Sequence, residues 1–353
     1  MRFLLFPFSL LFRIIVYIRN KFYRFDLFKT VKLGSKVISV GNISTGGTGK
    51  TPLVEYLARR LINKNKFVVI LTRGYKRIYD DIKVIELGYG DPDHKLGIDE
   101  LGDESLMLLD NFRDLEPGKG LLVVSDNKTT GAKLASSKFK PDLLIIDDGF
   151  QHRTLLRDLD IVMLDRNTRG MLLPAGNLRE PRSSLSRADI IVHNRKFYPH
   201  VENPRKKWKY NEIECEYAFE DFINIKDEKL EIKNAAAMAF CAIGDPDSFK
   251  KLLEQLHMSI THFIKFPDHH EFSDKDVNSI IELHRLEPDS VILTTQKDFI
   301  RIKYSQQVLH SAENSSNVSK DLLCNYPLFY AKIKLQFPID AEILTDRLNA
   351  LIN

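Results

Sequence analysis

The chain has 353 residues, which is too long for one average domain and makes two domains the natural expectation. With 43% hydrophobic and 28% charged residues, its composition is ordinary for a soluble globular protein able to bury a full core. A formal net charge of +4 allows an anionic partner, but it does not choose among nucleic acid, nucleotide and acidic lipid.

The cysteine content excludes two kinds of small site. The chain contains Cys215, Cys241 and Cys324, which are odd in number and far apart. Their spacing fits neither a disulfide framework nor a metal-binding motif. We therefore expect reduced thiols that serve packing in a cytoplasmic protein.

Residues 1–24 have the most unusual composition, because they combine many Phe, Leu, Ile and Tyr residues with Arg and Lys and contain no acidic residue. The apolar run 3–12 is broken by Pro7, and Arg13 interrupts it before a second run at 14–18. A membrane span needs about 20 continuous apolar residues, so spanning is not expected. Residues 19–22 also lack the small-residue cleavage site of a secretory signal.

Two structures remain for this segment. One is a helix that lies in a membrane interface, with its Arg and Lys side chains at anionic headgroups. The other is a helix whose apolar face packs on the protein's own core. Because so many Phe and Leu side chains must be buried somewhere, we predict that residues 1–28 form a membrane-interfacial helix.

From Lys36 onward, short apolar runs alternate with polar loops and helix-like stretches. This pattern predicts a mostly parallel sheet covered by helices on both faces, which binds ligands at the carboxyl ends of its strands. A helix is expected at 50–62, where apolar residues recur on one face. The expected strands are 37–40, 67–71, 121–125, 143–146, 161–164 and 190–192.

A change in composition and hydropathy pattern marks a domain junction. Residues 204–231 are Lys-rich and alternate in character, which predicts an extended ribbon. A second α/β unit follows, with strands at 236–242 and 291–294, a helix at 247–256, and a closing strand and helix; residues 310–320 read as a surface loop. We thus predict a phosphate-loop domain at 29–205, a ribbon at 206–232 and a smaller α/β domain at 233–353.

The strongest chemical signal is a glycine-rich turn between a predicted strand and a predicted helix. Glycines let successive backbone N–H groups point at phosphate oxygens, and the helix N-terminus adds positive potential. Lys50 would reach the β- and γ-phosphates of a nucleotide, and the Thr51 hydroxyl would bind Mg²⁺. The general pattern has Gly where this chain has Ser44. The predicted nucleotide-binding residues are Ser44, Thr45, Gly46, Gly47, Thr48, Gly49, Lys50 and Thr51.

Acidic residues follow at two places. Asp147 and Asp148 end an apolar strand, where an enzyme with a phosphate loop holds its Mg²⁺ ion, and a turn containing Gln151 and His152 comes next. Gly102-Asp103-Glu104 precedes a helical stretch at 105–109. The latter pair fits either acids favoured by the helix dipole or a carboxylate base near the nucleotide.

Two further triplets are ambiguous when taken singly. Arg73-Gly-Tyr75 could put a cation and an aromatic ring beside the phosphates. Asp268-His269-His270 suggests a metal site, but adjacent histidines rarely converge on one ion, and a structural role is equally open.

In their order along the chain, these segments resemble the tetraacyldisaccharide 4'-kinase family. The resemblance extends through most of the chain, and the segments at 147–152 and 173–181 are far more specific than a phosphate loop. The matching blocks are the loop 44–52, Arg73-Gly-Tyr, Gly102-Asp-Glu, Asp147-Asp-Gly-Phe-Gln-His, Leu173-Pro-Ala-Gly-Asn-Leu-Arg-Glu-Pro, Arg187-Ala-Asp, Phe266-Pro-Asp-His-His and Thr294-Thr-Gln-Lys-Asp.

The resemblance implies a P-loop NTPase-type domain joined by a β-ribbon to a smaller C-terminal α/β domain, with the active site between them. It implies transfer of the γ-phosphoryl group of ATP to the 4'-hydroxyl of a tetraacylated glucosamine disaccharide 1-phosphate, a lipid A precursor, giving lipid IVA. It also implies a peripheral enzyme at the cytoplasmic face of the bacterial inner membrane, held to the membrane surface by its N-terminal helix and without a nucleic-acid partner.

Carried over onto the matching motifs, the resemblance also assigns site residues. Asp103 would be the general base, with His269 as its partner and Lys50 as a further catalytic residue. The implied Mg²⁺ ligands are Thr51, Asp147, Asp148 and Glu104. The residues expected to contact the glycolipid are Arg73, Tyr75, Gln151 and His152.

The chain departs from the family pattern at two positions. The family usually has Arg after the strand at 121–124, where this chain has Asn127-Lys128. Lys keeps the charge but loses bidentate phosphate contact. His193 stands where Thr is common in the family, and no role is assigned to it.

A different class of protein is the alternative, namely a membrane-peripheral P-loop ATPase switch. Many such proteins carry a signature lysine where this chain has Thr45, which argues against the alternative. A GTPase would require Asn-Lys-x-Asp, and Gln296-Lys297-Asp298 lacks that spacing. A kinase would consume ATP only with an added glycolipid acceptor, whereas a switch would not need one.

Overall fold

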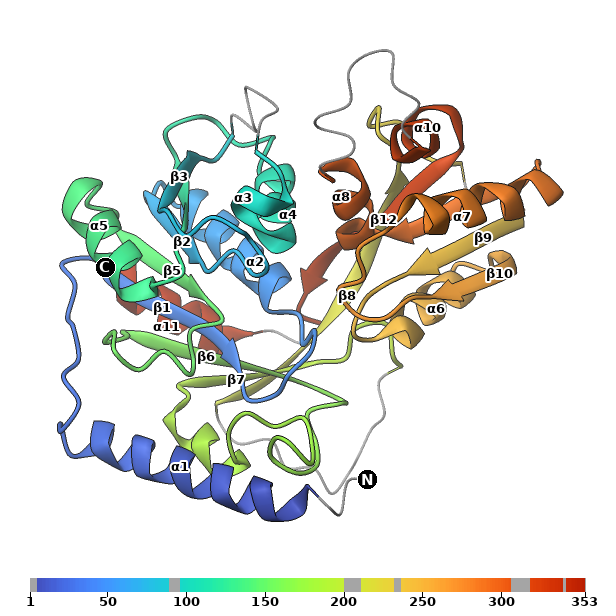
Figure 1. Ribbon diagram of the computed structural model, residues 1–353. Coiled ribbons are helices and arrows are strands. Elements are labelled where there is room, and N and C mark those ends of the chain that lie inside the picture. The colour runs from blue at the N-terminus through green and yellow to red at the C-terminus, as the bar shows by residue number, and fades with distance from the viewer. Residues whose placement is uncertain are drawn as a thin grey trace.

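The computed structural model describes residues 5–88, 96–199, 211–231, 236–305, 318–338 and 341–352. In these ranges the protein has a mixed α/β fold built on one large sheet (Figure 1). In the order in which they pair, its strands are β10 (Ser259–Lys265), β9 (Ala236–Cys241), β11 (Val291–Thr295), β12 (Leu328–Gln336), β8 (Glu212–Ile223), β7 (Ile190–Asn194), β6 (Leu159–Asp165), β1 (Lys36–Asn42), β5 (Leu143–Asp147), β2 (Val68–Thr72), β4 (Gly120–Val124) and β3 (Lys83–Glu86).

Most neighbouring strands of this sheet run parallel. Within the described ranges, only β3 with β4 and β8 with β12 pair antiparallel. The helices are α1 (Phe6–Arg24), α2 (Lys50–Ile62), α3 (Ile98–Leu101), α4 (Asp103–Asn111), α5 (Lys128–Lys138), the 3-10 helix η1 (Arg182–Arg187), α6 (Pro246–Gln255), α7 (Asp274–Leu286), α8 (Gln296–Lys303), α10 (Val318–Asn325) and α11 (Glu342–Ile352).

The long strand β8 joins the two halves of the sheet, which we define as β1–β7 and β9–β12. Its residues 212–215 pair with β7, and residues 216–223 pair with β12. This strand accounts for much of the extended ribbon predicted over 204–231, while residues 204–210 lie outside the described ranges.

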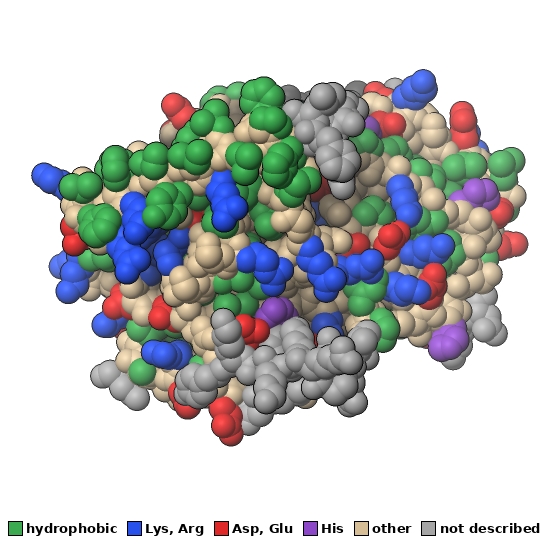
Figure 2. Space-filling model, turned by 90° about the horizontal axis from the view of Figure 1, so that it is seen from below, with side chains coloured by type: hydrophobic (Ala, Val, Ile, Leu, Met, Phe, Trp, Pro, Cys, Tyr) green, Lys and Arg blue, Asp and Glu red, His purple; other side chains and the backbone are tan. Residues whose placement is uncertain are grey.

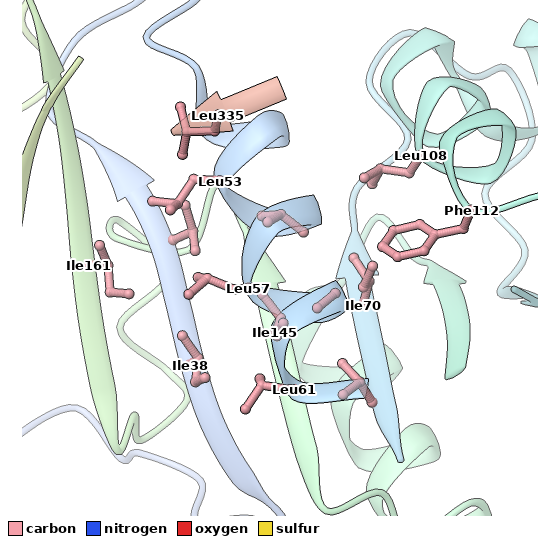
Figure 3. Close-up of a cluster of buried hydrophobic side chains, with 14 of the residues drawn as sticks. Ile38, Leu53, Leu57, Leu61, Ile70, Leu108, Phe112, Ile145, Ile161 and Leu335 are labelled. Carbon is pink, nitrogen blue, oxygen red and sulfur yellow. The ribbon is translucent and has the colours of Figure 1, made fainter. Parts of the chain in front are cut away.

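Alternate residues of the central strands pack on opposite faces of the sheet, because successive side chains of a strand point to opposite sides. Ile38 and Ile145 pack with Leu57 of α2 in one core cluster (Figure 3). On the other face, Val37 packs with Ala132 of α5. Both faces are therefore covered, as uniformly apolar parallel strands require.

Helix α1 lies below the sheet, and most of its apolar side chains face solvent (Figures 1 and 2). Val16 is buried, whereas Leu11 and Ile15 are 56% and 55% exposed. These side chains do not pack on the protein's own core, as the alternative arrangement would have required. None of the described helices combines the length and the apolar character needed to cross a membrane.

The predicted loop at 310–320 is wrong at its end. Residues 310–317 lie outside the described ranges, but Val318 begins helix α10. Leu322 and Leu323 of this helix are buried in a core cluster with α7 and α8. Burial of this short apolar pair outweighs the polar composition of the preceding residues.

Candidate active site

The glycine-rich turn connects the carboxyl end of β1 to α2. Gly46 and Gly49 have φ angles of 101° and 98°, in the left-handed region that favours glycine. A Cβ atom on Gly49 would lie 2.3 Å from Nδ2 of Asn194 and 2.5 Å from the hydroxyl of Tyr217. Both the backbone and the available space therefore select glycine at position 49.

Polar contacts behind the turn hold it in place. The backbone N–H of Thr45 donates to the carbonyl of Asn177 (2.7 Å), and Nδ2 of Asn194 donates to the carbonyl of Thr48 (3.0 Å). Ser44 is buried, and its Oγ lies 3.4 Å from Oγ1 of Thr168. Ser44 thus supports the turn from behind.

Cations surround the carboxyl end of β5. Lys50 places its Nζ 3.4 Å from Oδ1 of Asp148, and Nη1 of Arg179 donates to Oδ2 of the same carboxylate at 3.0 Å. The buried Lys128 donates its Nζ to the backbone carbonyls of Asp147 (2.6 Å) and Asp148 (2.7 Å). The ammonium group of Lys128 therefore holds the end of β5. It does not make the bidentate contact that Arg would make with a phosphate.

The two aspartates differ in their electrostatics. Burial and the charge of Glu104 raise the pKa of Asp147 to about 7. Burial would also raise the pKa of Asp148, but the charges of Lys50, Lys128 and Arg179 outweigh it and hold that pKa well below its usual range. Within the described ranges, Oδ1 of Asp147 is buried without a hydrogen-bond partner. A bound cation would satisfy this oxygen.

The donors at this strand end fit Mg²⁺. Thr51, Glu104, Asp147 and Asp148 all line one cavity and offer only oxygen atoms. In the part of the chain that the structure describes, no three His, Cys, Asp or Glu side chains gather closely enough to hold a metal by themselves. Mg²⁺ usually binds through one or two carboxylates and takes its remaining ligands from water and phosphate oxygens, so the residues present fit it.

Asp103, at the start of α4, is contacted by basic side chains from the C-terminal part of the chain. Arg301 donates through Nε (2.9 Å) and Nη2 (2.7 Å) to Oδ2 of Asp103, and Nδ1 of His269 lies 3.4 Å from the same oxygen. Burial would raise the pKa of Asp103, but the hydrogen bond with His269 and the charges of Lys297 and Arg301 hold it well below its usual range.

The segment Arg73-Gly-Tyr75 lies against the same cluster. The ring of Tyr75 meets the ring of His269 edge-on, with centroids 5.1 Å apart. A Cβ atom on Gly102 would lie 2.7 Å from the carbonyl oxygen of Tyr75, so the two backbones approach closely. The motifs at 73–75, 102–104 and 266–270 are thus neighbours in space.

A cavity of about 1370 Å³ runs from the phosphate loop along α2 toward β12. It is lined by most of the predicted site residues, including Arg73, Tyr75 and His269, but not by Ser44, Asp103, Gln151 or His152. Gln151 donates its Nε2 to the carbonyl of Asn42 at 2.7 Å.

His152 is tied to neighbouring hydroxyl groups. Its Nε2 lies 3.0 Å from Oγ1 of Thr129 and 2.9 Å from Oγ1 of Thr154. Burial and the charges of Lys128 and Arg157 lower the pKa of His152 to about 4, so it is neutral at pH 7.

The sequence predictions did not include several cations of this site. Arg179 reaches Asp148, and Lys297 donates to Oε1 of Glu104 at 3.1 Å. Arg301 follows Lys297 by four residues, so both lie on one face of α8. The four-residue spacing between Lys297, within the Thr-Thr-Gln-Lys-Asp block, and Arg301 could have indicated two cations on one helix face.

Together, a glycine-rich turn at a helix N-terminus and buried carboxylates beside a large cavity define a mixed α/β protein built to bind a phosphorylated ligand. Residues 1–353 match the sequence model of the family described as tetraacyldisaccharide-1-P 4'-kinase. The chain belongs to this family, and the resemblance inferred from its motifs is confirmed.

Named relatives agree with the family match. A tetraacyldisaccharide 4'-kinase from Aquifex aeolicus is 36% identical over 310 residues, which cover 86% of this chain and 91% of the relative. One from Chlorobium chlorochromatii is 30% identical over 368 residues, covering 98% and 92%. A crystal structure of LpxK from Aquifex aeolicus, described as an "apo" form in complex with ATP, superposes with a TM-score of 0.75 at 32% identity and covers 100% of this chain and 99% of its own.

Proposed function

We propose that this protein transfers the γ-phosphoryl group of ATP to the 4'-hydroxyl of a tetraacyldisaccharide 1-phosphate, a lipid A precursor, giving lipid IVA. The observation that carries the proposal is the full-length match to the 4'-kinase family. The ATP complex of the Aquifex aeolicus structure supports ATP as the phosphoryl donor.

The phosphate loop would bind the nucleotide. Backbone N–H groups of residues 46–51 would surround the phosphates, with Ser44 and Thr45 supporting the turn from behind, and the ammonium group of Lys50 would neutralise charge on the transferring group. Thr51, Glu104, Asp147 and Asp148 would hold Mg²⁺, which offsets the negative charge of the phosphates when bound. The buried Oδ1 of Asp147, which has no hydrogen-bond partner among the described residues, supports this assignment.

Asp103 would act as the general base together with His269. Asp103 is buried while His269 lines the cavity, and their side chains are 3.4 Å apart, so the two can work as one unit. The pKa of Asp103 is low, but phosphoryl transfer depends mainly on positioning and charge neutralisation, so a weak base suffices. Arg301 holds the carboxylate in place.

The glycolipid would approach from the membrane side of the molecule. The exposed apolar side chains of α1 would enter the bilayer interface, and its basic residues would meet anionic headgroups. This arrangement fits a peripheral enzyme at the cytoplasmic face of the inner membrane. Arg73, Tyr75, Gln151 and His152 are proposed to contact the sugar.

The domain division belongs to the same proposal. An interfacial helix at 1–28, a P-loop NTPase-type domain at 29–205, a ribbon at 206–232 and a smaller α/β domain at 233–353 would place the active site between two bodies. The contacts of His269 and Arg301 with Asp103 support a site completed from both sides.

A transfer assay with ATP labelled in the γ-phosphoryl group tests the proposed function. The label should appear in the lipid, and ATP should be consumed only when the tetraacyldisaccharide 1-phosphate is present. ATP hydrolysis that is equally fast without the lipid, with no labelled lipid formed, would instead identify the ATPase switch.

A further inference from the structure

Arginine side chains crowd around one buried carboxylate beneath the C-terminal part of α1. Glu180 is fully buried, and Arg187 donates to both of its oxygens, at 2.8 and 3.2 Å. Nη2 of Arg19, from α1, adds a contact of 3.3 Å to Oε1. A single negative charge therefore serves two guanidinium groups.

Arg153 belongs to the same cluster and, among the described residues, makes no close ion pair, although the charge of Glu180 also acts on it. Its Nη1 donates to the backbone carbonyl (3.1 Å) and to Oδ1 (3.3 Å) of Asn20, and its guanidinium lies 4.8 Å from the centre of the Tyr23 ring. Burial, and to a lesser extent the charges of Arg187 and Arg157, lower the pKa of Arg153 to about 10.

The cluster carries an excess of positive charge. Arg157 is neutralised by Asp160 at 2.7 Å. Arg19, Arg153 and Arg187 then contribute three positive charges against the one negative charge of Glu180, which leaves +2. Among the described residues, the Nε–H groups of Arg19 and Arg187 are also buried without an acceptor. A monoester phosphate, with a charge of about −1.5 to −2 at pH 7, would balance this excess.

The cluster lies at the level of the proposed membrane surface. Lys and Arg side chains gather beside the band of apolar side chains of α1 (Figure 2). Arg153 is partly exposed and follows directly after Gln151 and His152, the proposed sugar contacts. Arginine binds phosphate bidentately, and a phosphate carried by a membrane lipid would reach this depth.

We propose that Arg153, supported by Arg19 and Arg187, binds the phosphate group of a membrane lipid. This inference rests on the proposed function for its first source, the 1-phosphate of the acceptor, which would fix the far end of the disaccharide while the 4'-hydroxyl is phosphorylated. The second source of a phosphate group is the headgroup of an anionic phospholipid, a diester whose one negative charge would balance half of the excess.

Transfer kinetics with two acceptors test the first source. Wild type, Arg153→Met and Arg153→Lys are compared on the tetraacyldisaccharide with and without its 1-phosphate. With the phosphate present, Arg153→Met should raise KM about tenfold at unchanged kcat, as expected for the loss of one charged hydrogen-bonding partner, and Arg153→Lys should recover part of the loss. Without the phosphate, the variants should match wild type. Arg13→Met removes an equal charge from the exposed surface of α1 and should affect both acceptors alike.

Vesicle binding tests the second source without any turnover. Flotation with phosphatidylcholine vesicles, with and without phosphatidylglycerol, is measured for the same variants. If the headgroup is the ligand, Arg153→Met loses more of the preference for anionic vesicles than Arg13→Met does. The proposal is overturned if Arg153→Met and Arg153→Lys discriminate neither the acceptors nor the vesicles more than Arg13→Met. A wild type that phosphorylates neither acceptor contradicts the proposed function instead, and the vesicle comparison still decides the site.

Discussion

In the phosphate loop, the backbone conformation and the surrounding atoms require glycine at position 49. The surrounding space does not require glycine at position 47. Gly49 has a positive φ and close neighbours, whereas a Cβ added to Gly47 would have no other described residue within 4 Å besides its chain neighbours. Gly49→Ala should lower the free energy of unfolding by about 2–4 kcal/mol, from backbone strain plus overpacking. Denaturant unfolding measures this loss, with Gly47→Ala as the matched control. Equal stability of the two variants would contradict the argument.

The role of Asp103 can be separated from its structural contacts. Asp103→Asn should lower kcat by about 10²-fold, the lower end of the usual contribution of a general base, because the low pKa of Asp103 makes it a weak base, while ATP affinity stays the same. Steady-state kinetics and ATP titration measure both. Asp110→Asn is a suitable control, because Asp110 also joins α4 to α8 by an ion pair, with Lys303 at 3.1 Å. Near-normal turnover of Asp103→Asn would remove Asp103 from the base role.

Glu180 should make the stability of the protein depend on acid pH. Burial would raise its pKa, but hydrogen bonds from Arg187 outweigh this and lower the pKa in the folded state. The stabilisation is therefore complete above the ordinary Glu pKa of about 4.3 and is lost as pH falls through the lowered folded value. Unfolding of wild type and Glu180→Gln over a pH series should show a difference that is constant at neutral pH and shrinks in acid. A difference independent of pH would contradict this.

At the scale of elements, the exposed face of α1 gives a direct test of membrane binding. Replacing Leu11 and Ile15 by Asp removes two large apolar side chains from that face, each worth about 1.5–3 kcal/mol when buried. Vesicle flotation of the double variant should fall at least about tenfold. Leu286→Asp, at a residue 76% exposed on α7, is the control and should bind vesicles like wild type. Unchanged flotation of the α1 variant would exclude this face as the membrane contact.

The elements that the sequence predicted well are those whose local pattern agrees with their burial. Helix α2 begins and ends where predicted, because its apolar face packs on the central strands and its N-terminus follows the glycine-rich turn. Strand β10 was not predicted, since it is mostly half-buried at the sheet edge and lacks a clear alternation. Helix α7 was also not predicted, although Ser273 and Asp276 form a capping box, which is a sequence signal for a helix start.

At the scale of the whole molecule, the site depends on contacts between distant segments. The loop and the acidic strand end could be named from motifs, and the Asp103–His269 pairing from the resemblance to the family. The clamp of Arg301 on Asp103 joins residues 198 positions apart, and no local pattern encodes that meeting. Sequence motifs thus identify the chemical groups, while the arrangement of β8, β12 and α8 decides which of them touch.

Calorimetric titration with ATP in the presence of Mg²⁺ tests the central claim most directly. Wild type should bind, and Lys50→Met should bind at least about tenfold more weakly, because it removes a charged contact to the phosphates. Removing Mg²⁺ with a chelator should weaken wild-type binding as well. A folded wild-type protein that shows no affinity for ATP with Mg²⁺ would contradict the account.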